Sequence, residues 1–253
     1  NDSYAYAIFE TMNDRGKPLS PVDMLKAYLL APIEDDARRR NANQVWKRQV
    51  LDLISWGNES EPERDAACIK AWFRAQYADS KREGKAGAVD KDWELVGSVF
   101  HRWARDNKAR LGLGSEAASL ELITTHFPFF CSVYRQILDA SHTYTSGLEA
   151  IYYNAHNEFT WQNTVLLAPL RVTDDSDTVR RKLAVTASYL DIWLMRRTVN
   201  YIRVGYSSTS YTMWSLCKEI RGLSLEKLVQ VLMDKVDVDD VTFSGSPSRG
   251  RHG

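Results

Sequence analysis

The feature that most constrains the fold is the segment "SDTVRRKLAVTASYLDIWLMRRTVNYI", residues 176–202, which contains neither glycine nor proline. Its middle, residues 183–195, is apolar on nearly all sides, and this is typical of a helix buried inside a protein. At a rise of about 1.5 Å per residue, such a helix is roughly 40 Å long. The sequence therefore predicts a long central helix around which other elements pack.

Nearly every other periodic segment also predicts a helix. Residues 20–30 are the clearest case, because Ser20 is a natural N-cap, Pro21 suits the first helical position and Asp23 follows three residues after the cap. Pro128 is expected to kink or split the helix in which it lies. Further helices are expected near residues 33–54, 62–78, 93–111, 116–140, 147–157 and 163–170, with two shorter ones after residue 202. The predicted fold class is all-α, an irregular multi-helix array.

Charge and cysteine usage limit the function classes. The 253 residues include 33 Lys and Arg against 33 Asp and Glu, so a nucleic-acid contact would need a local basic patch. Three widely spaced cysteines form no disulfide framework or zinc motif, and they are read as buried small hydrophobic residues in a reducing compartment: Cys68, Cys131 and Cys217. No signal peptide and no apolar run of the ~20 residues that span a bilayer is recognised. We expect a cytoplasmic protein without a membrane partner.

A short cationic turn, "NDRGK" at residues 13–17, comes directly before the capped helix. Gly16 permits a positive φ, and Asn13 tolerates one. Backbone amides in such a turn, the helix start and the cations Arg15 and Lys17 together favour an anion site, in which Arg15 would hold a phosphate through two hydrogen bonds. The glycine–lysine spacing is not that of a Walker loop.

A structural role is the alternative for this turn, in which Glu10, Arg15 and Asp23 pair with one another and merely hold the turn. The same two readings apply to Arg196 and Arg197, which follow the apolar middle of the long helix. At about 100° per residue, at least one of them faces the core or a groove and needs an acidic or phosphate partner. Ion pairs within the fold and contact with a nucleic-acid backbone both remain open.

Other candidates carry weaker signals. A helix near residues 33–54 gathers basic side chains, but acidic residues precede them and a solvated helix face is favoured: Arg38, Arg39, Arg40, Lys47 and Arg48. His142 and His156 superficially resemble an HNH nuclease, but they lie among helices rather than in a ββ-hairpin. No metal ligand and no catalytic residue is assigned.

The opening stretch resembles a known signature. "IFETMNDRGKPLSPVDMLKAYLL", residues 8–30, is similar to the second signature of the GmrSD-like and SspE-like family, in which a phenylalanine–glutamate pair precedes N-x-R-G, a leucine and an aspartate-led helix. The matching positions are Phe9, Glu10, Asn13, Arg15, Gly16, Leu19, Asp23 and Lys26. "YLDIWLMRRTVNY" and "YSSTSYTMWSLCKEIRG" are similar to the family's downstream helical region.

The resemblance implies a restriction protein that acts on modified phage DNA. Members combine a nucleotide-hydrolysing domain bearing a D-G-Q-Q-R motif, a helical region and, often, an HNH nuclease domain. Neither motif occurs in this chain. We therefore expect part of a larger protein, with the end of the nucleotide-binding-type domain at residues 1–31, a helical domain at 32–243 with a subdomain boundary considered near 79–90, and a linker or tail at 244–253.

The expected function is that of the helical part of a modification-dependent DNA restriction protein, which links a nucleotide-sensing domain to a nuclease and is not catalytic alone. Glu10, Asn13, Arg15, Gly16 and Lys17 would form part of a phosphate site that absent sequence completes. The remaining candidates would be structural or contact a DNA backbone: Asp23, Lys26, Arg196 and Arg197.

A nucleoside triphosphate and a divalent metal are implied for the whole protein, with no cofactor in this chain. Its partners would be modified DNA, the missing domains and a second copy in an oligomer. The alternative is a non-enzymatic helical scaffold or dimerisation module.

Overall fold

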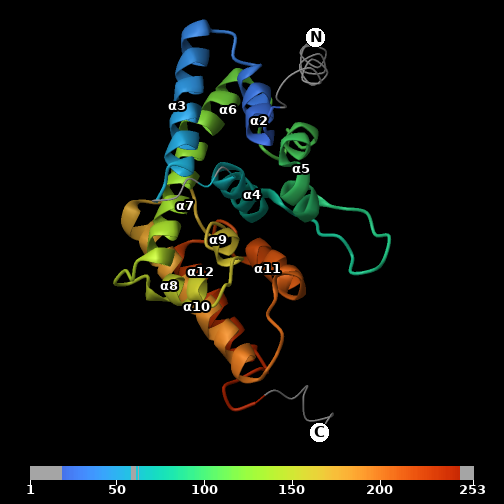
Figure 1. The fold of residues 1–253 in the computed structure, drawn as a ribbon, viewed down its shortest axis with the longest axis vertical. Coiled ribbons are helices and arrows are strands. Elements are labelled where there is room, and N and C mark those ends of the chain that lie inside the picture. The colour runs from blue at the N-terminus through green and yellow to red at the C-terminus, as the bar shows by residue number, and fades with distance from the viewer. Residues whose placement is uncertain (1–18, 58–60, 62, 246–253) are drawn as a thin grey trace. The chain divides into compact units, whose positions relative to one another are not determined.

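The computed structural model describes residues 19–57, 61 and 63–245, and every regular element in these ranges is a helix (Figure 1). Within them, the β-type pairing is limited to an isolated bridge between Thr242 and Gly245. The all-α prediction is confirmed. No helix in the described ranges combines the length and the apolar character needed to cross a membrane.

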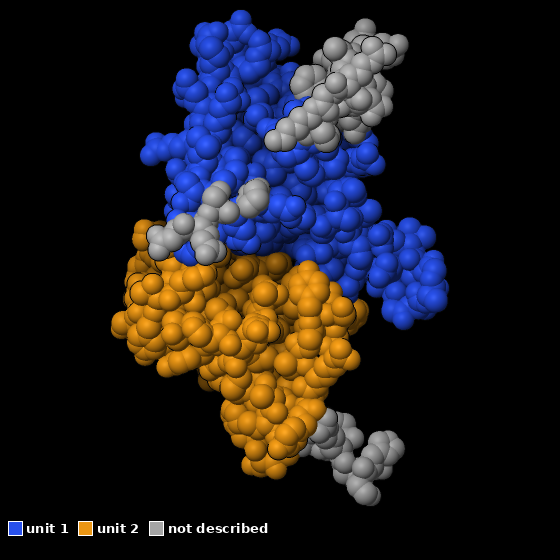
Figure 2. All heavy atoms as spheres, viewed as in Figure 1, with its two compact units in different colours: residues 1–135 blue, residues 136–253 orange. Residues whose placement is uncertain are grey.

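The chain divides into two compact units, residues 1–135 and 136–253, which Figure 2 shows in different colours. The division falls inside helix α7 (Phe127–His142). Residues 79–90, which the sequence analysis considered as a subdomain boundary, lie within the first unit, as does the helix after the signature turn.

The first unit is built from helices that share an aromatic core. Its α2 packs against α3, α4, α5 and α6. In the core, the ring centroids of Trp46 and Phe127 are 4.2 Å apart, and those of Trp72 and Phe130 are 5.1 Å apart. The elements are α2 (Pro21–Leu30), α3 (Asp36–Ile54), α4 (Arg64–Tyr77), α5 (Asp92–Asp106), α6 (Glu116–Glu121), the π-helical turn η2 (Leu122–His126) and the first part of α7.

Helix α2 forms as local sequence rules predict. Ser20 is its N-cap, with a side-chain oxygen that accepts a hydrogen bond from the Asp23 amide at 3.1 Å, and Pro21 opens the helix. The predicted apolar stripe is buried and consists of Val22, Leu25 and Leu29. Helix α3 begins at Asp36 rather than at residue 33, because the carboxylate of Asp35 caps it by accepting the Arg38 amide at 2.7 Å.

Pro128 was predicted to kink or split its helix, and the structure shows an interruption of the regular hydrogen-bond ladder while the backbone stays helical. Proline has no N–H and therefore cannot donate to the carbonyl four residues earlier. The preceding turn, η2, widens to the π form, and the N–H of Phe127 donates to the carbonyl of Leu122, five residues back. The predicted single helix at 116–140 is therefore three elements, α6, η2 and α7.

In the second unit, α10 packs against α8, α9 and α12. Helix α10 is shorter than predicted, because Tyr201 adopts a left-handed conformation with a φ of 56° and ends the helical path. One side of its apolar middle is not buried in the core but lines a groove beside α12. The elements are α8 (Glu149–His156), α9 (Gln162–Val165), α10 (Ser176–Val199), α11 (Tyr206–Ile220) and α12 (Leu225–Val238).

Candidate functional site

The residues predicted to hold a phosphate lie outside the described part of the chain, so their role stays a prediction: Glu10, Asn13, Arg15, Gly16 and Lys17. The described structure begins at Leu19, within the signature. Three of its matched positions, Leu19, Asp23 and Lys26, can therefore be placed, and the last two lie in the first two turns of α2.

Asp23 and Lys26 pair locally. Asp23 accepts hydrogen bonds from the Ser20 hydroxyl at 2.8 Å and from the Lys26 ammonium at 3.1 Å. Burial raises the pKa of the Asp23 carboxyl, but the bonds from Ser20 and Lys26 outweigh it and hold this pKa below its ordinary value. Both side chains thus stabilise the start of the helix that follows the signature turn.

A cleft of about 580 Å³ lies beside the start of α2, and we call it the α2 cleft. Helices α2, α3, α4 and α5 all contribute to its walls, which combine an apolar surface with charged groups. The side chains that matter for binding are the apolar Val50, Leu51 and Ile54 of α3, and the charged Lys47, Asp65 and Lys70. The cleft could therefore hold a molecule with an apolar part and an ionic part.

The charges of the α2 cleft are incompletely paired. Neither Lys47 nor Lys70 has an ion pair or a side-chain hydrogen bond to any residue that the structure describes. Asp65 is only 7% exposed, and its carboxylate accepts the amide of Ala66 at 2.7 Å. Burial raises the pKa of this carboxyl, and the negative charges of Asp23 and Glu63 raise it further. The cleft thus offers two cations and an acceptor to a ligand.

The arginine pair on the long helix is held within the second unit. Arg197 forms a bidentate pair with Asp239, with distances of 2.8 and 3.2 Å, and its guanidinium lies 4.1 Å from the ring centroid of Trp193. Arg196 donates to the carbonyl of Val236 at 2.6 Å. Both side chains therefore tie the end of α10 to the end of α12. Their partners lie about 40 residues away in sequence, at separations of 40 and 42.

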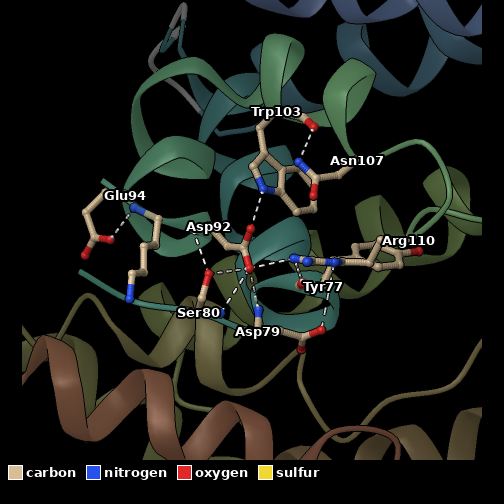
Figure 3. Close-up of polar contacts among 9 residues, drawn as sticks. Tyr77, Asp79, Ser80, Asp92, Glu94, Trp103, Asn107 and Arg110 are labelled. Atoms are coloured by element: carbon tan, nitrogen blue, oxygen red, sulfur yellow. Dashed lines mark hydrogen bonds and ion pairs between the residues drawn. The ribbon is translucent and has the colours of Figure 1, made fainter. Parts of the chain in front are cut away.

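A polar network that the sequence analysis missed surrounds Asp92, the first residue of α5 (Figure 3). One carboxylate oxygen accepts the amides of Asp79 and Ser80 at 3.1 and 3.0 Å and the Ser80 hydroxyl at 2.8 Å. The same oxygen accepts Arg110 at 2.5 Å, and the other accepts the indole N–H of Trp103 at 2.9 Å. The polar loop at 79–90 is thus anchored to a helix start.

The Asp92 network is saturated with donors. Burial raises the pKa of the carboxyl, but the bonds from Trp103, Ser80 and Arg110 outweigh it and hold the pKa below its ordinary value. A carboxylate held charged by so many donors is a poor proton carrier near neutral pH. Its role is to fix the loop. The network could not be predicted from residue spacing, because Ser80 and Asp92 are 12 residues apart and Arg110 is 18 residues further on.

The histidine candidates do not form a cluster. His142 and His156 each direct Nδ1 to a carbonyl of their own helix at 2.9 Å, that of Leu138 and that of Tyr152. Across the residues that the structure describes, no group of three or more His, Cys, Asp or Glu side chains is placed to hold a metal ion.

Comparison of the chain with protein-family models, with curated proteins and with solved structures found no match. A functional assignment therefore depends on the opening signature and on the geometry of the α2 cleft.

Proposed function

We propose that the chain is the helical part of a modification-dependent DNA restriction protein, and that the α2 cleft forms part of its nucleotide-binding site. The observation that carries the proposal is continuity between the signature and the cleft. The signature at residues 8–30 includes α2, and Ser20, Asp23 and Lys26 at the start of that helix line the cleft. The loop that resembles a phosphate-binding turn therefore connects to the rim of a pocket.

The cleft chemistry fits a nucleotide. Phosphates pair with ammonium groups, and Lys47 and Lys70 have no partner among the described residues. The half-occupied carboxylate of Asp65 can accept an N–H from a base or a sugar hydroxyl. An apolar wall on α3, formed by Val50 and Ile54, can cover the flat face of a base. Arg15 and Lys17 of the signature would add further cations.

The contribution of this chain would be binding rather than chemistry. A bound nucleotide would supply its own phosphoanhydride, and the resemblance implies a divalent metal for the whole protein. Lys47 and Lys70 would neutralise phosphate charge, and Asp65 would orient the ligand. We therefore expect the chain alone to bind a nucleotide without hydrolysing it or cutting DNA.

The test is calorimetric titration of the chain with ATP and with GTP. Replacing both Lys47 and Lys70 with alanine should weaken binding by roughly 30-fold, at about tenfold per 1.4 kcal/mol and about 1 kcal/mol per lost charged contact. Lys108→Ala is the matched control, because Lys108 is an exposed lysine of the same unit that lies outside the cleft. Arg15→Ala should weaken binding as well.

Two results would contradict the proposal. Absence of binding by the unaltered chain removes the nucleotide site from this cleft. Equal affinity of the double variant and the Lys108 control places the nucleotide elsewhere. Turnover by pure protein that is lost in Arg15→Ala would show instead that the chain is itself an enzyme.

A helical scaffold is the second candidate, and the groove between α10 and α12 favours it. This groove has a volume of about 360 Å³ and an apolar lining that includes Ile192 and Val229, and Met233 on its edge is 58% exposed. An exposed apolar surface of this kind is typical of an interaction site. Light scattering of the chain and of Met233→Glu tests it: loss of a dimer in the variant, together with no nucleotide binding, would favour the scaffold.

A further inference from the structure

Two cysteines from different helices meet in the core of the first unit. Cys68 lies on α4 and Cys131 on α7, 63 residues apart in sequence, and their sulfur atoms are 4.0 Å apart. Both side chains are fully buried. The thiols are in contact, and a disulfide requires the two sulfur atoms to approach from this distance to about 2.05 Å.

The packing around the pair holds the two helices in place. Trp72 of α4 stacks on Phe130 of α7, the neighbour of Cys131, with ring centroids 5.1 Å apart. Arg135, one helical turn after Cys131, forms an ion pair of 3.2 Å with Asp52 of α3. The approach of the two thiols is therefore set by the packing of buried helices rather than by surface loops.

We propose that Cys68 and Cys131 are a redox modification site, at which a small-molecule disulfide such as oxidised glutathione converts the two thiols into a reversible cross-link between α4 and α7. The thiolate of one cysteine attacks a sulfur of the oxidant and releases one glutathione thiolate. The second cysteine then attacks the protein sulfur of this mixed disulfide and releases the other glutathione. The protein loses two electrons and two protons, and oxidised glutathione is reduced to two molecules of glutathione.

Access controls the rate of this reaction. Burial raises the pKa of the Cys131 thiol well above its ordinary value, so the closed unit presents a protonated thiol that reacts slowly. The π-helical turn η2 ends at His126, five residues before Cys131, and it interrupts the regular ladder of the helix. Opening at this interruption would admit the oxidant. The site therefore responds to sustained oxidation rather than to brief exposure.

The experiment equilibrates the chain with defined ratios of reduced and oxidised glutathione, with and without urea. After acid quenching, intact mass spectrometry and peptide mapping measure the fraction of the chain that carries the Cys68–Cys131 disulfide. If the native core holds the thiols in a bonding arrangement, the equilibrium constant for the Cys68–Cys131 disulfide should be roughly 30- to 900-fold larger in the folded chain than in urea, the range that corresponds to the usual stabilisation by a disulfide. The folded, oxidised chain should also melt at a higher temperature than the reduced chain.

Single variants provide the controls. Cys68→Ser and Cys131→Ser should each abolish the cross-link, whereas Cys217→Ser, which alters a buried cysteine of the second unit, should leave it unchanged. Peptide mapping of the unaltered chain keeps the test valid if a variant fails to fold. An equilibrium constant that is the same or smaller in the folded chain would overturn the proposal. A folded product that carries glutathione on either cysteine, or that links Cys217 instead, would overturn it as well.

Discussion

Two carboxylates of the first unit, Asp92 and Asp65, have the same burial and opposite electrostatics. Each is 7% exposed, and each lies in the first turn of a helix, α5 for Asp92 and α4 for Asp65. Yet the pKa of Asp92 is held below its ordinary value and that of Asp65 is raised. Burial disfavours the charge at both sites, so the difference comes from the neighbours.

Those neighbours differ in kind. Asp92 receives an arginine, an indole, a hydroxyl and backbone amides, which compensate its lost hydration. Asp65 accepts the amide of Ala66, and it lies near two other negative charges, those of Asp23 and Glu63. The first arrangement closes a loop and engages both carboxylate oxygens with donors of the protein. The second leaves an incompletely compensated acceptor on the wall of the α2 cleft, which supports the proposed binding role.

Removal of Asp92 should have the largest effect. We expect Asp92→Ala to lower the free energy of unfolding by about 3 kcal/mol, because the change removes the acceptor of the Trp103 indole and the nearest acidic partner of Arg110. Urea unfolding followed by tryptophan fluorescence measures it. Asp90→Ala is the control, since Asp90 forms an exposed pair with Arg82 worth less than about 1 kcal/mol. Equal losses of unfolding free energy in the two variants would show that the Asp92 network does not stabilise the fold more than an exposed ion pair does.

The effect of Asp92→Ala should depend on pH. Because the folded pKa of Asp92 lies below its unfolded value, its contribution is complete above the unfolded pKa of about 3.9 and is lost as the pH falls through the folded pKa. Unfolding of the parent chain and the variant should thus be compared from pH 7 down to the lowest pH that retains a folded baseline. A stability difference that stays constant on acidification would refute the assigned ionisation.

Loss of the indole donor alone should cost less. Trp103→Phe removes the bond to Asp92 and is expected to lower the free energy of unfolding by about 2 kcal/mol. It should also move the acid transition of the protein to higher pH, because the carboxylate loses a donor. Trp46→Phe removes similar ring area from the same unit without touching this carboxylate, so it should leave the pH dependence unchanged. Identical pH profiles for both variants would contradict the role given to Trp103.

The smallest effect, of opposite sign, is expected at Asp65. Asp65→Asn should raise the free energy of unfolding by about 0.5–1 kcal/mol at pH 7, since the amide keeps an acceptor for Ala66 and removes an unfavourable charge. A raised folded pKa means that the parent chain loses stability as the pH rises through that pKa, so the gain should vanish in acid. Destabilisation at pH 7 would show that Asp65 has a stabilising partner.

Local signals were enough to predict α2. Its cap, its opening proline and its buried stripe all involve residues within one or two turns, so the order of residues specifies them directly. A disturbance of the helix at Pro128 was predictable for the same reason, although its π-helical form was not. The end of α10 before Tyr201 could not be predicted in this way. A positive φ is unusual for tyrosine, and the sequence around Tyr201 contains no residue pattern that predicts it.

The hydrogen-bond and ion-pair partners of buried polar side chains could not be predicted from local sequence. The sequence predicted that Arg196 and Arg197 need partners but did not identify them, because Asp239 reaches Arg197 only when α12 packs against α10. Likewise, nothing in the polar loop at 79–90 identified Asp92 as its anchor. The α2 cleft is also a product of packing, since its walls come from four helices that no local pattern brings together.

The order of residues by itself determined that the chain is helical, where most helices start, and which turn resembles a phosphate-binding signature. These properties depend on capping, periodicity and backbone restrictions that act over a few residues. Only the tertiary structure decided which carboxylate is satisfied, which lysines are left unpaired and which thiols touch. The physical reason is that the free energy of a buried polar group depends on the neighbours that packing brings to it, and these neighbours are distant in the chain.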